Sequence, residues 1–189
     1  MSERNTWIRS LHDLGLAAWF GGSLMGAVGL NGAAKDEGGT DETSARIASS
    51  GWAKWTPVNA AAIGAHLFGG GGLLAVNAHR VATQQGVAAS TAAKTVVTVG
   101  ALAATAYART LGKKIELASS PDPQDAERAE RHPIDTTDAR RQLTYVQWAV
   151  PALTGCLVIL NALHGEQQRP KEQLRGMWGR ACSAAPFLP

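Results

Sequence analysis

Four stretches of the 189-residue chain contain no Lys, Arg, Asp or Glu, and nearly every charged residue lies between or outside them. A helix of a water-soluble protein carries a polar face, but three of these stretches lack charge over the ~20 residues that cross a bilayer core. The pattern predicts an all-α polytopic membrane protein, a bundle of four transmembrane helices. The uncharged stretches are Leu14 to Ala34, Trp55 to His79, Thr95 to Ala108 and Gln142 to Gly165.

The borders of the uncharged stretches give the predicted organisation. Residues 32–56 are predicted to form a loop with a short helix at 41–50, and Pro57 to lie in the first turn of the second span. Pro151 is expected to kink the fourth helix and Gly165 to end it. The membrane domain is residues 1–165, with spans at about 11–31, 57–79, 91–109 and 144–164, followed by a basic C-terminal tail at 166–189.

Two alternatives to four full spans stay open. A soluble four-helix bundle is the first, but Gly69 to Gly72 would cost a water-exposed helix roughly 1 kcal/mol each relative to Ala. Lipid tolerates such a run better, because the backbone there has only its own hydrogen bonds. Either a bulky neighbour lies against these glycines or the helix is locally loose. A re-entrant third helix is the second alternative, since its uncharged core is only 14 residues long.

Composition and motifs exclude several classes of function. The net charge of +3 comes without a basic stripe interleaved with aromatic residues, so nucleic acid is not a predicted partner. Cys156 and Cys182 fall at different predicted depths, which argues against a disulfide. The chain has no P-loop, HExxH or GxSxG motif, and the carboxylates of residues 127–131 alternate with arginines as on a solvated helix. The sequence therefore favours a protein that is not an enzyme.

Small residues recur four positions apart in two of the predicted spans. In lipid this spacing lets helix backbones approach closely, so that van der Waals contact replaces the missing hydrophobic drive. The faces serve either packing within the bundle or binding of another subunit, and the sequence leaves both open. The pairs are Ala17 and Gly21, Gly22 and Gly26, and Gly100 and Ala104.

Three histidines fall at one predicted membrane face, because odd spans begin where even spans end. His12 opens the first span, His79 closes the second and His164 closes the fourth. Three imidazoles near a carboxylate suit zinc, copper or haem iron. The alternative is that these side chains simply lie at the interface, where polar groups cost little. The polar residues beside them are Asp13, Asn77 and Asn161.

His66 lies near the middle of the second span, beside the glycine run. Ionisable groups at bilayer depth usually face the bundle interior. We expect a neutral imidazole bonded to a threonine of the third helix, or else a haem ligand or proton-relay group. About 13 residues of helix, or ~20 Å, separate it from the outer three histidines, too far to share one metal. The candidate threonines are Thr95, Thr98 and Thr105.

The start of the first span, Leu11-His12 followed by Trp19-Phe20-Gly21-Gly22, resembles the first helix of copper-resistance-D-type bacterial membrane proteins. The resemblance implies a small helical inner-membrane protein that handles copper or haem. It carries over one residue, His12. The abundance of Ala and Gly also suits a bacterial genome rich in G and C.

The sequence leaves three hypotheses of function. The first is a non-catalytic accessory or assembly subunit of a larger membrane complex, with the lipid bilayer and a membrane protein or a second copy as partners. The second is a metal- or haem-binding protein using the interfacial histidines. The third is a small oligomeric channel or transporter lined by His66. The expected location is the inner (plasma) membrane, multi-pass, with both termini in the cytoplasm.

Overall fold

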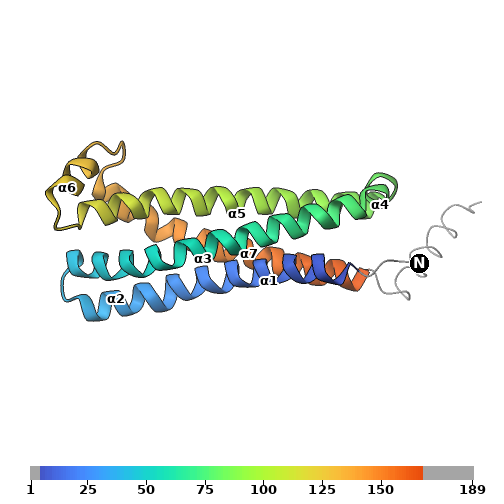
Figure 1. Cartoon of the computed structure of the whole chain (residues 1–189), viewed down its shortest axis with the longest axis horizontal. Coiled ribbons are helices and arrows are strands. Elements are labelled where there is room, and N and C mark those ends of the chain that lie inside the picture. The colour runs from blue at the N-terminus through green and yellow to red at the C-terminus, as the bar shows by residue number, and fades with distance from the viewer. Residues whose placement is uncertain (1–4, 168–189) are drawn as a thin grey trace, which may run out of the picture.

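The chain is built of helices joined by short connections (Figure 1). A computed structural model describes residues 5–167, with side chains described for residues 5–163. Within residues 5–167 no strand occurs. The elements are α1 (Thr6–Met25), a π-helical turn η1 (Gly26–Leu30), α2 (Asn31–Gly38), α3 (Asp41–Val76), α4 (Ala78–Thr83), α5 (Gln85–Ala118), α6 (Pro123–Glu130) and α7 (Thr136–Gln167).

Four of the described helical runs are long and apolar enough to cross a membrane, which confirms the predicted fold class. The longest, α3, has 36 residues. At 1.5 Å per residue it is ~54 Å long, well beyond the ~30 Å of a hydrocarbon core, so its ends extend outside. The four runs are Thr6–Gly38, Asp41–Val76, Gln85–Ala118 and Thr136–Leu163.

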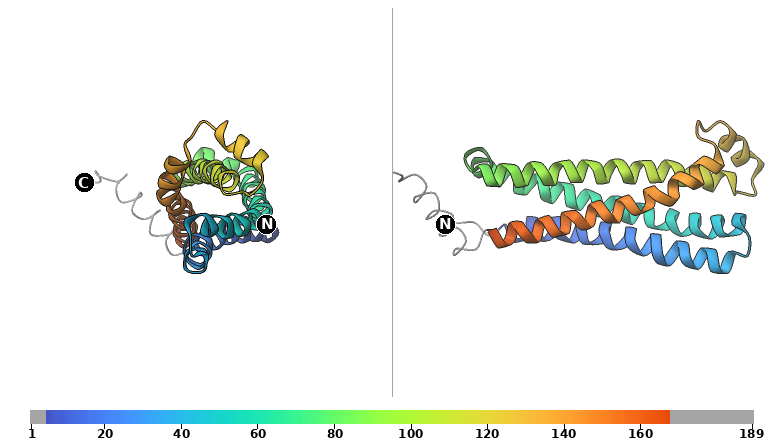
Figure 2. Two further views of the ribbon diagram at one scale, coloured as in Figure 1. Left: turned by 90° about the vertical axis from the view of Figure 1, so that its left-hand side faces the viewer. Right: turned by 180° about the vertical axis from the view of Figure 1, so that it is seen from behind.

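The bundle consists of two helix pairs. Helix α1 packs chiefly against α3, and α5 packs chiefly against α7. Contact between α1 and α7 joins the pairs on one side, whereas α3 and α5 touch little (Figure 2). The start of α1, the short α4 and the end of α7 lie at one end of the bundle, and α2 and α6 lie at the other (Figure 1). The seam between α3 and α5 is therefore the open side.

Several predicted helix ends are wrong. Most of residues 32–56 is helical, because α2 continues the first helix and α3 begins at Asp41, where the Thr40 side chain accepts the backbone N–H of Thr43. Pro57 consequently lies inside α3 and not in its first turn. The second long helix ends at Val76, three residues before its predicted end, and the fourth runs past Gly165. Apolar runs locate the bilayer, and these helices extend beyond it.

One buried layer links all four long helices. It consists of Trp19 from α1, Ala62 from α3, Ala101 from α5 and Val150 from α7. Trp19 is fully buried, and its indole Nε1 donates to Thr105 Oγ1 of α5 at 3.2 Å. Because the other three members are small or β-branched, the indole fills the space between the two helix pairs.

The ion pairs within residues 5–163 gather at the end that carries α6. Asp135 precedes α7, and its carboxylate accepts the backbone N–H of Thr137, which lowers the pKa of this carboxyl. A hydrogen bond from Ser120, helped by Arg128, likewise lowers the pKa of Asp125. This end is thus a charged, water-facing cap on the bundle.

Candidate functional site

Glycines bring α1 and α3 close enough to form the site. A Cβ atom on Gly15 would lie 2.5 Å from both the Ala62 carbonyl oxygen and the His66 backbone nitrogen. A Cβ atom on Gly69 would lie 2.6 Å from the backbone nitrogen of His12. Only hydrogen fits at these two positions, so the helices cross with their backbones in contact.

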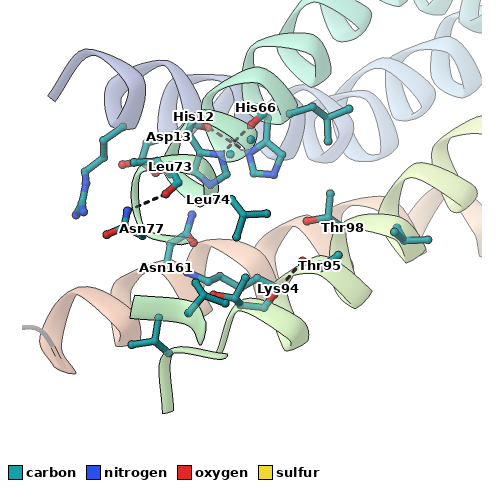
Figure 3. A pocket seen from close by; sticks show the side chains of 18 of the residues that line it. His12, Asp13, His66, Leu73, Leu74, Asn77, Lys94, Thr95, Thr98 and Asn161 are labelled. Carbon is teal, nitrogen blue, oxygen red and sulfur yellow. Dashed lines mark hydrogen bonds between the residues drawn. The ribbon is translucent and has the colours of Figure 1, made fainter. Parts of the chain in front are cut away.

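The crossing pairs His12 with His66 (Figure 3). His12 Nδ1 lies 2.8 Å from the His66 carbonyl oxygen, and His66 Nδ1 lies 3.2 Å from the His12 carbonyl oxygen. Their rings stack with centroids 4.0 Å apart and planes 21° apart. Because a carbonyl only accepts, each Nδ1 carries the proton and donates it. In the neutral form of either ring, Nε2 would then be left as an acceptor.

The expected position of His66 is wrong in two respects. It is not ~20 Å from His12, since the glycine run allows α1 and α3 to cross at this level. Its Nδ1 bonds to the His12 backbone and not to a threonine. Thr105 accepts instead from Trp19, whose ring lies edge-on to the His66 ring with centroids 6.0 Å apart.

The histidine pair lines a cavity of about 380 Å³ between α1, α3 and α5, at the end that carries α4 (Figure 3). Three cations line it, Arg9, Arg80 and Lys94, against one carboxylate, Asp13. None of the four takes part in an ion pair within the described part of the chain. The cavity therefore carries an excess of uncompensated positive charge.

Polar side chains line the cavity on both sides of the histidine pair. Asn77 donates through Nδ2 to the Leu73 carbonyl at 2.8 Å, and Asn161 approaches from α7. Thr95 and Thr98 lie on the α5 wall of the cavity, where the Thr95 hydroxyl donates to the backbone carbonyl oxygen of Thr91. These groups and the two Nε2 atoms can give directional hydrogen bonds to a bound molecule.

The structure brings together part of the predicted histidine site. His12 lines the cavity with its predicted neighbours Asp13, Asn77 and Asn161. His79 lies exposed on α4 and is not a lining residue, and the side chain of His164 falls outside the described residues. The sequence did not indicate the pairing of His12 with His66, although the glycine run facing His12 is the feature that permits it.

A metal centre does not emerge from these groups. Among the side chains described, no group of three or more His, Cys, Asp or Glu residues is placed to bind a metal ion. The rings of His12 and His66 are stacked with their planes 21° apart, so the in-plane lone pairs of the two Nε2 atoms lie in separate, nearly parallel planes and do not meet at one ion. Shared coordination would require at least one ring to turn and break its hydrogen bond.

The predicted packing residues divide between the inside and the outside of the bundle. Gly22 and Gly26 lie directly under the indoles of Trp55 and Trp52 of α3. On the opposite pair, Gly100 faces Leu153 of α7 and Ala104 packs against the buried layer. Ala17 and Gly21, in contrast, are exposed, and a Cβ atom on Gly21 would meet nothing within 4 Å.

The glycine run, residues 69–72, packs against α1. Gly70 lies beside the His12 ring, and a Cβ atom on Gly72 would come within 2.9 Å of Ile8. With Gly69 against the His12 backbone, three of the four glycines are covered by α1, while Gly71 is open. A bulky neighbour, and not a loose helix, accounts for this part of the sequence.

No protein-family model matches the chain, and no curated protein or solved structure matches it either. The similarity of the first helix to copper-resistance-D-type proteins stays a prediction.

Proposed function

We propose that this protein is a non-catalytic, multi-pass membrane protein that binds a small anionic ligand in the cavity beside His12 and His66. The observation that supports this most directly is the set of three cations, Arg9, Arg80 and Lys94, which line the cavity with one carboxylate, Asp13, and form no ion pair inside residues 5–163. Like charges gathered at a membrane edge, where the dielectric is low, repel one another. A bound anion relieves that repulsion.

The chemistry of the cavity favours a carboxylate or phosphate group. Arginine forms paired hydrogen bonds with such planar or tetrahedral anions, and lysine adds a point charge. A volume of about 380 Å³ suits a small organic anion. The histidine Nε2 atoms accept hydrogen bonds, so hydroxyl or amide groups on the same ligand find partners deeper in the cavity.

The channel hypothesis receives less support from this geometry. A second cavity lies at the opposite end, and Leu102 lines both. We infer that the buried layer of Trp19, Ala62, Ala101 and Val150, against which Leu102 packs, separates the two cavities. We therefore propose a binding role for the cavity, within an accessory subunit, in preference to a continuous path.

The proposed ligand makes a direct prediction about Lys94. Replacing it in Lys94→Gln should weaken the binding of small anions roughly tenfold or more, because a charge-assisted hydrogen bond is lost. Isothermal titration of the detergent-solubilised protein with inorganic phosphate and succinate measures the change, with choline as the oppositely charged probe. Lys113→Gln is the matched control, because Lys113 is exposed at the other end and paired with Glu116. Equal affinities in the two variants, or equal binding of choline, would contradict the proposal.

The exposed Ala17 and Gly21 favour a membrane partner as part of the same function. Small residues four apart on a lipid-facing helix admit a second helix at close range. We expect Gly21→Leu to dissociate the protein from its partner or second copy, with an unchanged thermal midpoint, when complexes are compared by native mass spectrometry. Gly64→Leu is the control, since Gly64 is also exposed with nothing within 4 Å of a Cβ. The same complex in both variants would rule out this face.

We place the protein in the inner (plasma) membrane of a bacterium with both termini in the cytoplasm. The first and last described residues lie at one end of the bundle, as four spans require (Figure 1). Labelling of single cysteines at Thr83 and Ser120, which lie at opposite ends, tests the direction: an impermeant reagent added outside intact cells should react only at residue 120.

A further inference from the structure

The second cavity has a volume of about 710 Å³ and lies on the open seam between α3 and α5, toward α2 and α6. Helix α7 closes its back with residues such as Leu143 and Val150. The His12–His66 pair does not line it, and Leu102 is the residue that both cavities share. The two cavities therefore differ in their linings, and of the two only the first holds the His12–His66 pair.

The walls of this cavity change from charged to apolar along its length. Its outer part meets Arg109, Glu116 and Arg140, which border the uncharged stretches of α5 and α7. Its inner part meets Ile63 and Leu102, which lie inside the uncharged stretches of α3 and α5. The cavity therefore spans the depth at which a lipid headgroup gives way to its chains, and Trp side chains are typical of this level.

Three buried polar atoms in the described residues have no hydrogen-bond partner: Trp55 Nε1, Asn59 Oδ1 and Arg140 Nε. All three belong to residues that line this one cavity. Such atoms are costly to leave unpaired, which makes their coincidence in one place informative. Arg140 also has no ion-pair partner among the side chains of residues 5–163, and Glu116, which lines the same cavity, is paired with Arg109 and Lys113.

The neighbouring tryptophan shows that the protein can satisfy an indole at this depth. Trp52 Nε1 donates to Asn31 Oδ1 at 2.9 Å, and Asn31 Nδ2 donates in turn to Gln147 Oε1 at 2.6 Å. Trp55, one turn further along α3, has no such partner in the part of the chain that the structure describes. Its ring packs over Gly22.

The unpaired atoms define what would fit. Two donors, one of them a guanidinium, need an acceptor that carries negative charge, and the Asn59 oxygen needs a donor. The apolar inner walls need a hydrocarbon body. We propose that an anionic phospholipid with a hydroxyl-bearing headgroup, of the phosphatidylglycerol class, occupies this cavity. Its phosphodiester lies beside Arg140 and Trp55 and a headgroup hydroxyl beside Asn59, with these side chains turning on binding to expose the three buried atoms, and one chain runs inward along Ile63 and Leu102.

The test uses the whole protein, delipidated in mild detergent and titrated with defined lipids under native mass spectrometry. Phosphatidylglycerol should bind on the order of tenfold more tightly than phosphatidylcholine, which lacks both net charge and hydroxyls. Glycerophosphoglycerol, the same headgroup without chains, should bind far more weakly. Equal binding of the two lipids would overturn the proposal, as would equal binding of the soluble headgroup, which would assign the site to a free phosphodiester.

Two variants connect the lipid to this cavity. Arg140→Gln and Trp55→Phe should each reduce the preference for phosphatidylglycerol severalfold or more, and the second keeps an aromatic ring over Gly22. Arg141→Gln is the matched control, because Arg141 is the next residue, is exposed and is paired with Asp138. Should Arg140→Gln fail to fold, Trp55→Phe still decides the matter. A preference unchanged in Trp55→Phe and in any folded Arg140→Gln would mean that water or detergent satisfies the unpaired atoms, and the proposal would fail.

Discussion

Replacing Gly15 by alanine is expected to destabilise the protein by about 1–3 kcal/mol or more, although alanine is ordinarily the better helix former. The added Cβ atom would lie 2.5 Å from two backbone atoms of α3, the Ala62 carbonyl oxygen and the His66 nitrogen. Backbone atoms within a helix cannot move aside singly, so α1 and α3 would have to separate. That separation also breaks the two hydrogen bonds between His12 and His66.

Circular dichroism of the protein in mild detergent measures the thermal unfolding midpoint. Gly21→Ala is the matched control, six residues along the same helix, where a Cβ meets nothing within 4 Å. We expect this control to melt at or above the temperature of the unaltered protein. If Gly15→Ala and Gly21→Ala melted at the same temperature, the close crossing of α1 and α3 would be refuted. The pairing of His12 with His66 would be refuted as well.

The number and type of the helices could be predicted because exclusion of charge from a bilayer is a strong constraint. Three of the four uncharged stretches lie within one long helical run each, including the third, whose uncharged core is the shortest, and the second runs three residues past the end of α3 at Val76. Helix ends could not be predicted by the same signal. Residues 41–56 are polar enough to suggest a loop that holds only a short helix at 41–50, yet they all continue α3 outside the membrane, with Thr40 as its cap.

The candidate site could be predicted only in part, because the prediction assigned depth by counting residues from the ends of parallel spans. That arithmetic put His12, Asp13, Asn77 and Asn161 at one level, and all four line one cavity. It put His66 far from His12, because it ignored where two helices cross. The crossing is set by Gly15 and Gly69, whose partners lie on another helix and cannot be read from local spacing.

The second large effect is expected at Trp19. This side chain is 0% exposed and is the one bulky member of the layer that joins the two helix pairs. Trp19→Ala should lower the free energy of unfolding by about 3–5 kcal/mol, the usual cost of removing a buried tryptophan. The loss should exceed that of a typical core change, since α3 and α5 barely touch and the indole spans the gap between the pairs.

Trp19→Phe separates packing from hydrogen bonding. It keeps most of the ring but removes the N–H that donates to Thr105, whose own hydroxyl still donates to the Ala101 carbonyl. No buried donor is then left unpaired, so we expect a loss of only about 1 kcal/mol beyond the change in volume. An aromatic ring beside His66 is retained, and anion binding at the His12–His66 cavity should persist in this variant.

Denaturant titration in mixed micelles measures both Trp19 variants against Trp148→Ala, which removes an indole that is 47% exposed on α7. A lipid-facing ring contributes little to the core, so this control should stay close to the unaltered protein. If Trp19→Ala and Trp148→Ala unfolded at the same denaturant concentration, the layer around Trp19 would not be what joins the helix pairs. The closed bundle between the two cavities would then lose its physical basis, and a continuous path through Leu102 would become the better explanation of both cavities.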